Sequence, residues 1–298
     1  MPTRSIRRLA ATAVGVALLV LGAVLLLQDD GSAVQEPTGL PAPKQPIPRD
    51  PERLAEVLTQ NTTALRAAVV RWRSDGDPAK GTPPEEVTLR GLFHQRIHLL
   101  LGDKRRLARA TIANLRGSVA AETRDIVGAR RALTRLAKGP VRRRRKVKHR
   151  TGRALPAGEL LRLYRRAQRR FGVSWRVLAA VNLVETGFNR LRSNSVSDAR
   201  GPMQFIPSTW RAYGLGGDVH DPGDAILGAA NYLRASGAPD NYRRALYSYN
   251  NSDLYVEAVL RYARRMRRNP DTFYVLYSWQ VFVRKGSALR RITGPRPR

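Results

Sequence analysis

The sequence predicts a mainly helical protein with three parts: an N-terminal transmembrane helix, a helical hairpin or bundle, and a second helical domain. Three observations support this fold class. Residues 9–27 form an apolar run without charge, two long stretches repeat apolar residues at helical spacing, and no run alternates cleanly enough to predict a sheet. The one β-structure that the sequence allows is a small two-stranded ribbon in the loop 190–201.

The composition limits the functional classes. Of the 298 residues, 42% are hydrophobic and 26% charged, which excludes a disordered tail and a multi-span membrane protein. The net charge of +31 predicts contact with polyanions, namely nucleic acid, anionic lipid or an acidic polymer. The absence of cysteine excludes disulfides, thiolate metal sites and a cysteine nucleophile. Four scattered histidines argue against a histidine-rich metal centre.

The apolar run 9–27 indicates where the chain operates. It nearly crosses the ~30 Å hydrocarbon core of a bilayer at ~1.5 Å per residue. Arginines in the basic segment 1–8 precede it and aspartates follow it, so the positive-inside rule keeps that segment in the cytoplasm and the remainder outside. We expect an uncleaved signal anchor; the alternative is a secreted protein cut after Gly31-Ser32-Ala33. Outside a bacterial membrane the available polyanions are lipid headgroups and wall polymers, which argues against nucleic acid.

Composition shifts divide the remainder of the chain. The expected segments are a Pro-rich linker at 28–51, a helical region at 52–137, a basic linker at 138–155, a second helical domain at 156–275 and a basic C-terminal tail at 276–298. A basic run is usually a solvated linker. Its functional interpretation is contact with anionic lipid headgroups or wall polymers, worth ~1 kcal/mol per basic residue near a membrane surface.

The region 52–137 has the periodicity of an antiparallel hairpin or bundle. One helix ends at Ser74, before a turn rich in Asp, Gly and Pro, and a second starts near Glu85 and runs to Gly102. A longer helix follows, with apolar residues from 112 to 133 near heptad spacing. His94 and His98 lie one helical turn apart, but no third ligand is nearby, so we expect ordinary histidines.

The second domain shows helix signals throughout its length. Expected helices cover residues 156–170, 174–184, 208–213, 224–235, 242–249 and 253–267, with Ser174 and Ser252 as N-terminal caps.

One carboxylate stands out in the helix that Ser174 caps. Glu185 continues an apolar stripe from Leu178 and Val181 toward Phe188, so its side chain is expected to face the core. It also lies at the negative end of the helix dipole. Both surroundings disfavour the ionised form, which predicts a raised pKa and a general acid active near neutral pH. The structural alternative is a helix-end glutamate turned into solvent.

The neighbourhood of Glu185 carries a series of motifs. They are ETGFN at 185–189, Ser195, GPMQFIPSTW at 201–210, DPGDAI at 221–226, AANYL at 229–233 and ALYSYNN at 245–251. This succession resembles the soluble lytic transglycosylase (SLT) domain, particularly its secreted actinobacterial versions, over about residues 157–270. The resemblance implies a lysozyme-like, goose-type helical fold with a glycan-binding cleft.

The resemblance implies a single catalytic residue and no cofactor. Glu185 would protonate the oxygen between N-acetylmuramic acid and N-acetylglucosamine in peptidoglycan. The resulting carboxylate would take the proton from the muramic acid C6 hydroxyl, which attacks C1 and closes a 1,6-anhydro ring.

The resemblance also implies substrate-binding residues. They are Ser195, Gly201, Met203, Gln204, Phe205, Tyr249 and Asn250. Ser195 would hydrogen-bond the N-acetyl region, and the Tyr249 hydroxyl would lie near Glu185. The structural alternatives are a loop-capping Ser195 and a buried helix-end Tyr249. The segment 214–220 lacks the alternating carboxylates of a calcium loop, so we predict no metal.

These observations predict a membrane-tethered peptidoglycan lytic transglycosylase whose catalytic domain faces the wall. Two alternatives stay open. A lysozyme-type hydrolase of the same bond would need a second carboxylate to position water, for which Asp198 is the candidate. A non-catalytic scaffold would bind glycan and contact cell-wall, division or secretion proteins through residues 52–137.

Overall fold

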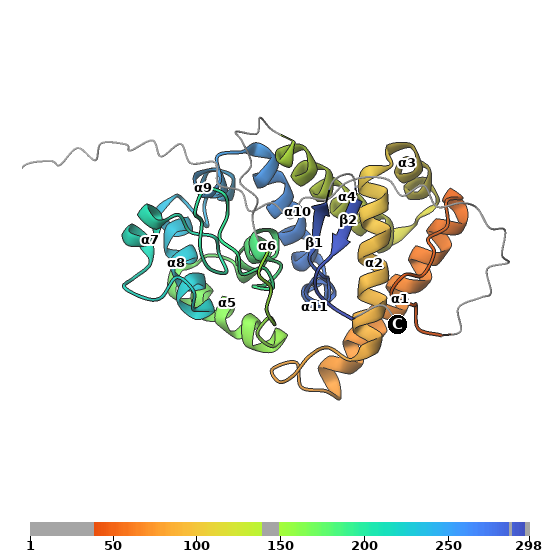
Figure 1. The fold of residues 1–298 in the computed structure, drawn as a ribbon, viewed down its shortest axis with the longest axis horizontal. Coiled ribbons are helices and arrows are strands. Elements are labelled where there is room, and N and C mark those ends of the chain that lie inside the picture. Colours follow the sequence, from red (N-terminus) through yellow and green to blue (C-terminus); the bar gives the residue numbers. More distant parts are fainter. Residues whose placement is uncertain (1–38, 139–148, 286–287, 296–298) are drawn as a thin grey trace, which may run out of the picture.

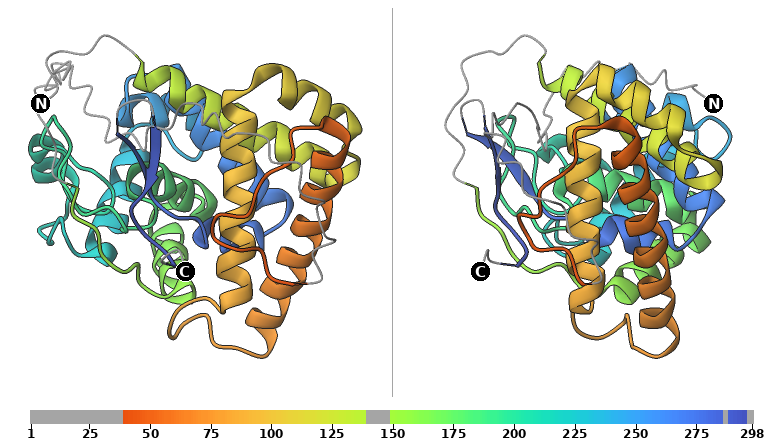
Figure 2. Two further views of the ribbon diagram at one scale, coloured as in Figure 1. Left: turned by 45° about the vertical axis from the view of Figure 1, so that its right-hand side comes forward. Right: turned by 90° about the vertical axis from the view of Figure 1, so that its right-hand side faces the viewer.

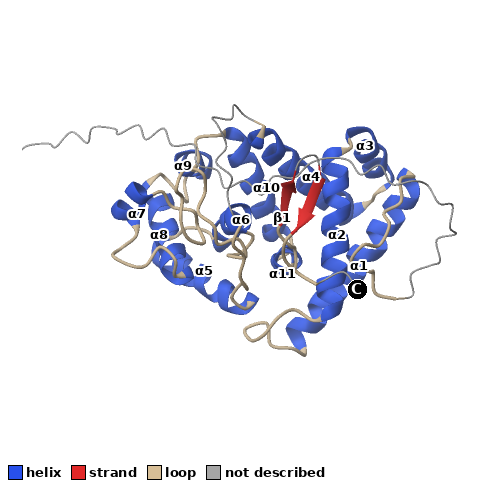
Figure 3. Cartoon of the chain, viewed as in Figure 1, coloured by secondary structure: helices blue, strands red, loops and turns tan. Residues whose placement is uncertain are grey.

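The computed structural model describes residues 39–138, 149–285 and 288–295, and this part of the chain is mainly helical, as the sequence predicts (Figure 1). Figure 3 shows one small hairpin of strands among the helices. The expected cytoplasmic tail 1–8 and transmembrane helix 9–27 lie outside the described residues. None of the helices within the described ranges combines the length and the apolar character needed to cross a bilayer.

The first helical region contains four helices. They are α1 (Pro51–Ser74), α2 (Glu85–Asp103), α3 (Arg105–Asn114) and α4 (Gly117–Ala137). The Asp50 side chain starts α1 by accepting a hydrogen bond of 2.8 Å from the Arg53 amide. Helices α1 and α2 run antiparallel (Figure 2), so the expected hairpin is confirmed. The expected long third helix is instead two helices, because Leu115 is extended and Gly117 takes a positive φ of 54°.

The second region contributes seven helices to the described part. They are α5 (Ala157–Phe171), α6 (Trp175–Thr186), α7 (Pro207–Tyr213), α8 (Pro222–Ala235), α9 (Tyr242–Tyr249), α10 (Asp253–Arg268) and α11 (Thr272–Tyr277). All but α11 were expected within a few residues. The loop 190–201 holds no ribbon of its own; it takes part only in isolated bridges, which join Thr151 to Leu191 and Arg200 to Phe205.

The two helical regions share one hydrophobic core. Trp72 of α1, together with Ile126 and Leu133 of α4, belongs to the same buried cluster as α5, α6 and α10. The Trp72 ring meets Tyr274 of α11 edge-on, with ring centroids 5.6 Å apart. Helix α4 lies along α10 (Figure 1), so the bundle forms one wall of the second region. Periodicity identified the buried faces of these helices but not their partners.

A buried carboxylate joins α4 to α10. Asp125 is only 5% exposed and lies 2.7 Å from Nε of Arg265, with Arg261 and Arg264 each 3.3 Å away. Removing a charge from water is unfavourable unless partners surround it. The three arginines supply these partners, and all of them come from two neighbouring turns of α10.

The two histidines that lie one turn apart on α2 are buried in the bundle. The ring centroids of His94 and His98 are 4.2 Å apart, and His94 Nε2 lies 3.3 Å from a carboxylate oxygen of Glu122. Burial, with a smaller contribution from the His94 charge, lowers the pKa of His98 to about 3.

The C-terminal segment 276–298 differs from the basic tail expected for it. Strands β1 (Phe282–Lys285) and β2 (Ala288–Arg291) form an antiparallel hairpin in which Phe282 pairs with Arg291. Gln95 of α2 exchanges two hydrogen bonds of 2.8 Å with the Gln280 backbone and so ties the hairpin to the bundle. The runs of apolar residues in this segment are short and are interrupted by Arg and Lys. The composition therefore did not reveal the hairpin.

The buried carboxylate leads to a stability prediction. Because Asp125→Asn removes the buried charge on which three cations converge, we expect it to lower the free energy of unfolding by about 3 kcal/mol. Urea unfolding followed by circular dichroism measures the difference. Glu56→Gln is the matched control, since the Arg53–Glu56 pair is exposed and its loss should change stability by less than ~1 kcal/mol. Equal effects of the two substitutions would contradict the role given to Asp125.

Candidate active site

Glu185 occupies the last turn of α6 and faces the core. The residue is only 3% exposed. Helix α6 ends at the next residue, Thr186, and Gly187 caps it with a φ of +59°. The orientation predicted from the apolar stripe is confirmed, and the alternative of a solvent-facing glutamate is wrong.

Tyr255, in the first turn of α10, is the direct partner of Glu185. Its hydroxyl donates a hydrogen bond of 2.7 Å to Oε1 of the carboxylate. Burial raises the pKa of Glu185 to about 8, and the Tyr255 hydrogen bond counteracts part of this effect by stabilising the charged form. The sequence analysis missed Tyr255, because it lies on the apolar stripe of α10 like any core tyrosine.

Tyr249, at the end of α9, lies beside Tyr255 instead of contacting the carboxylate. The two rings stack in parallel with centroids 6.4 Å apart. Its hydroxyl donates a 2.7 Å hydrogen bond to the Met203 carbonyl. Burial, followed by the charge of Glu185, raises its pKa well above the usual value. Tyr249 therefore lies in the electrostatic neighbourhood of the acid and fastens the 201–205 segment to it.

The segment 201–205 is shaped by a tight turn. Gly201 has a φ of +71°, and a Cβ there would collide with the Val219 carbonyl oxygen, so only glycine fits. The side chains of Met203 and Phe205 were expected to bind substrate, but both are buried in the core. Phe205 packs edge-on against Tyr249 at 6.0 Å. These two side chains therefore anchor the segment 201–205 in the core.

Two buried oxygen acceptors near this segment have no hydrogen-bond partner among the described residues. They are Oε1 of Gln204 and Oδ1 of Asn250, both at positions expected to bind substrate. Gln204 is held by its own amide nitrogen, which donates 3.0 Å to the Gly201 carbonyl. A buried acceptor without a partner is unfavourable by about 1–3 kcal/mol, which a donor on a ligand would relieve.

Ser195 shapes a turn, as its structural alternative predicted. Its hydroxyl accepts hydrogen bonds from the amides of Ser197 and Ala199, at 3.2 and 2.9 Å. Asp198 lies in the same exposed turn, 2.5 Å from the Arg200 guanidinium. The hydrogen bond from Arg200 is the main reason that the pKa of Asp198 is lowered.

A buried polar network holds the segment 201–205 against α6. The Tyr164 hydroxyl donates to Asn182 Oδ1 at 2.6 Å. Asn182 and Thr186 then both donate to the Pro202 carbonyl, at 2.8 and 2.7 Å. The Asn189 amide closes the network by donating 2.9 Å to the Thr186 hydroxyl. Fully satisfied networks of this kind specify a single arrangement.

Metal ligation receives no support from the side chains present. In the three described ranges, no group of three or more His, Cys, Asp or Glu residues is arranged to hold a metal ion.

Comparisons with known proteins agree with this geometry. The family model of the transglycosylase SLT domain matches residues 162–271. The chain is similar to a membrane-bound lytic murein transglycosylase F of Thiobacillus denitrificans (strain ATCC 25259 / T1), with 28% identity over 132 residues. The match covers 42% of this chain and only 28% of the relative's length. No solved structure matches the chain significantly.

The matched range contains α6 with its buried acid, the turn at Gly201 and the first turn of α10, which are the parts that meet around Glu185. Residues 162–271 of this chain form a transglycosylase SLT domain of the lysozyme-like type.

Proposed function

We propose that this protein is a peptidoglycan lytic transglycosylase in which Glu185 is the single general acid and base. The observation that carries the proposal is a buried carboxyl group with a pKa of about 8, hydrogen-bonded to one tyrosine and adjoining the segment 201–205. The family match supports the substrate class, since SLT domains are named for transglycosylation.

The first step uses the protonated acid. With a pKa of about 8, Glu185 holds its proton at neutral pH and donates it to the oxygen that joins N-acetylmuramic acid to N-acetylglucosamine. The bond between this oxygen and C1 of the muramic acid breaks as the leaving sugar becomes neutral. Positive charge then develops at C1.

The second step uses the carboxylate that the first step leaves. It accepts the proton of the C6 hydroxyl of the same sugar while the hydroxyl oxygen bonds to C1. The product is a 1,6-anhydro ring, and no water is consumed. The Tyr255 hydroxyl stabilises the carboxylate between the two steps, because it donates to Oε1.

The surroundings of Asp198 favour this mechanism over hydrolysis. Glycosidases that activate water generally employ a second carboxylate. Asp198, the candidate for that role, lies in an exposed turn and is paired with Arg200. Glu185 alone serves both steps when the nucleophile belongs to the substrate.

Substrate contacts follow from the unpaired acceptors. We assign Gln204 Oε1 and Asn250 Oδ1 to the N–H and O–H groups of the sugars. Ser195 and Gly201 act through the shape of their turns, and Met203 and Phe205 act by packing beneath the cleft.

We propose that residues 9–27 anchor the protein in the cell membrane, with the catalytic domain outside and cleavage of the anchor as the alternative. The relative is named a membrane-bound enzyme, which supports this placement. The basic segments would contact anionic wall polymers or lipid headgroups. We propose that the outer faces of the region 52–137 contact cell-wall or division proteins.

The mechanism predicts that Glu185→Gln abolishes cleavage. We expect wild-type full-length protein in detergent to release anhydro-muropeptides from purified peptidoglycan, and the variant to release them at least about a hundredfold more slowly, since it has no proton to donate. Mass spectrometry of the products measures this. Asp198→Asn is the matched control and should retain activity.

Other products would reject the mechanism. Fragments one water heavier, lost in Asp198→Asn, would identify a hydrolase. Protein that folds and sediments with the wall but releases no fragments would favour the alternative of a non-catalytic scaffold that binds glycan.

A second prediction concerns Tyr255. Because its hydrogen bond stabilises the carboxylate, Tyr255→Phe should raise the pKa of Glu185 further. The alkaline limb of the rate–pH profile then shifts to higher pH, while the fold is retained. Tyr247→Phe, at an exposed tyrosine of the same region, should leave the profile unchanged. An alkaline limb that stays in place in Tyr255→Phe would show that this contact does not tune the acid.

A third prediction links the acid to stability. The pKa of Glu185 is about 8 in the folded protein against 4.5 as its ordinary value, so between these pH values the folded state holds a proton that the unfolded state releases. The stability that this proton contributes is complete below pH 4.5 and is lost as pH rises toward 8. Each pKa unit corresponds to about 1.4 kcal/mol.

Glu185→Gln should therefore gain stability relative to wild type as pH rises from 4.5 to 8. Thermal unfolding over this pH series measures the gap. Glu56→Gln, on the surface, should show none of the trend. A gap independent of pH would mean that Glu185 ionises normally.

A further inference from the structure

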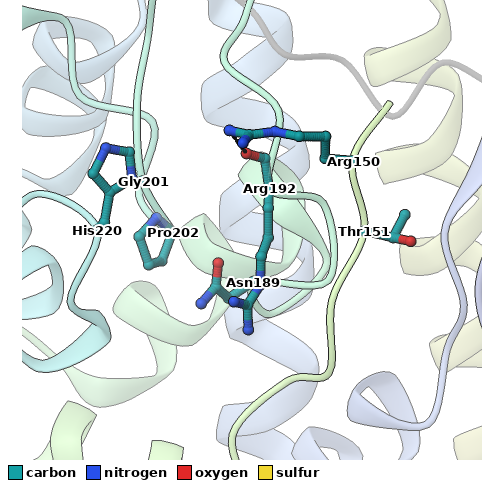
Figure 4. Close-up of a pocket in the computed structure, with 7 residues that line it drawn as sticks. All are labelled: Arg150, Thr151, Asn189, Arg192, Gly201, Pro202 and His220. Atoms are coloured by element: carbon teal, nitrogen blue, oxygen red, sulfur yellow. Dashed lines mark hydrogen bonds between the residues drawn. The ribbon is translucent and has the colours of Figure 1, made fainter. Parts of the chain in front are cut away.

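A cavity of about 310 Å³ lies beside the 201–202 turn (Figure 4). The proposed reaction does not use this cavity. Of the residues expected to bind substrate, only Gly201 lines it. Pro202 also lines it, one residue before Met203, whose carbonyl is bound to Tyr249. The cavity therefore adjoins the segment 201–205 along the chain, and the polar network that holds Pro202 connects it to the end of α6.

Two arginines face this cavity because two segments pair beside it. Thr151 forms a bridge with Leu191, and the Arg192 amide donates 2.8 Å to the Arg150 carbonyl. This pairing brings the side chains of Arg150 and Arg192 into the same lining, opposite His220 (Figure 4).

Neither guanidinium has a carboxylate partner among the described residues. Arg150 donates 3.3 Å to the Arg192 carbonyl, and Arg192 donates 2.9 Å to the Arg153 carbonyl. A guanidinium has five N–H donors in a fixed fork, so most of them remain available. The lining contains no acidic residue. The nearest acidic residues along the chain flank His220: Asp221 accepts the Asp224 amide, and Asp218 accepts the His220 amide.

A buried amide adds a further polar group. Asn189 is 8% exposed and lines the cavity. Its backbone is held at a φ of +63° by the bond from its amide to Thr186. The network that fixes the turn at Pro202 thus also holds the backbone of Asn189.

We propose that this cavity binds a carboxylate of the peptide chains that peptidoglycan carries, and so selects glycan that bears peptide over bare glycan. The proposal rests on the proposed function for the choice of polymer. Unpaired arginine forks match the two oxygens of a carboxylate. The volume is at the lower end for small-ligand pockets, which suits one terminal group and not a length of sugar chain.

Binding is tested apart from catalysis, in full-length Glu185→Gln protein. The ligand is a disaccharide–peptide fragment of peptidoglycan with free carboxylates, compared by calorimetry with the same fragment after its carboxyl groups have been converted to amides. The test variant adds Arg150→Gln and Arg192→Gln. The matched control adds Arg166→Gln, which removes an exposed positive charge from α5 outside the cavity.

We expect the free-carboxylate fragment to bind about tenfold or more weakly to the double variant, with Arg166→Gln close to the parent. The amidated fragment should bind both proteins equally. Arg192→Lys, which keeps the charge but loses the fork, should give intermediate affinity, and thermal unfolding should show all variants folded.

Three results would overturn the proposal. One is equal affinity of the double variant and its parent. Another is an equal loss in Arg166→Gln, which would indicate general charge attraction. The third is inorganic phosphate displacing the fragment at lower concentration than acetate does, which would assign the cavity to phosphate groups.

Activity separates this proposal from the proposed function. With Glu185 restored, Arg150→Gln/Arg192→Gln should raise KM on peptide-bearing strands at unchanged kcat and leave bare strands unaffected. If wild type cleaves neither strand, the proposed function fails, and the binding measurement still decides the role of the cavity.

Discussion

The hydrogen bond from Tyr255 to Glu185 is the constraint on which the rest of the site depends. A carboxyl group without water must either stay neutral or find a partner, and here burial favours the protonated form while one hydroxyl stabilises the charged form. The contact requires the end of α6 and the start of α10 to meet. Tyr249 stacks on Tyr255 and binds the Met203 carbonyl, so the cleft segment is built outward from this single contact.

The N-terminal bundle contributes to the site through α10. Three arginines of that helix converge on Asp125 of α4, and the first turn of the same helix carries Tyr255. Helix α10 is therefore clamped between the bundle and α6, with apolar residues of both regions in one core. The bundle is thus part of the support of the acid.

In the proposed function, the turn at Gly201 and Pro202 separates two kinds of recognition. On one side, buried acceptors of Gln204 and Asn250 suit the neutral polar groups of sugars. On the other side, two arginines that have no acidic partner in the described part of the chain suit an anion. Asn182 and Thr186 hold this turn through the Pro202 carbonyl, so both sides share one rigid support. A polymer that carries sugars and carboxylates offers both chemistries at once.

The sequence by itself determined the helices and the orientation of Glu185, since both depend on residues three or four positions apart along one helix. The resemblance to the SLT domain identified the motifs around Gly201 and Asn250. Tertiary structure alone decided that Tyr255, seventy positions from Glu185, is its partner, because no local pattern distinguishes it from a core tyrosine. It also decided the C-terminal hairpin and the shared core of the two helical regions. Periodicity shows which face of a helix is buried, but the partner of that face is set by packing between distant segments.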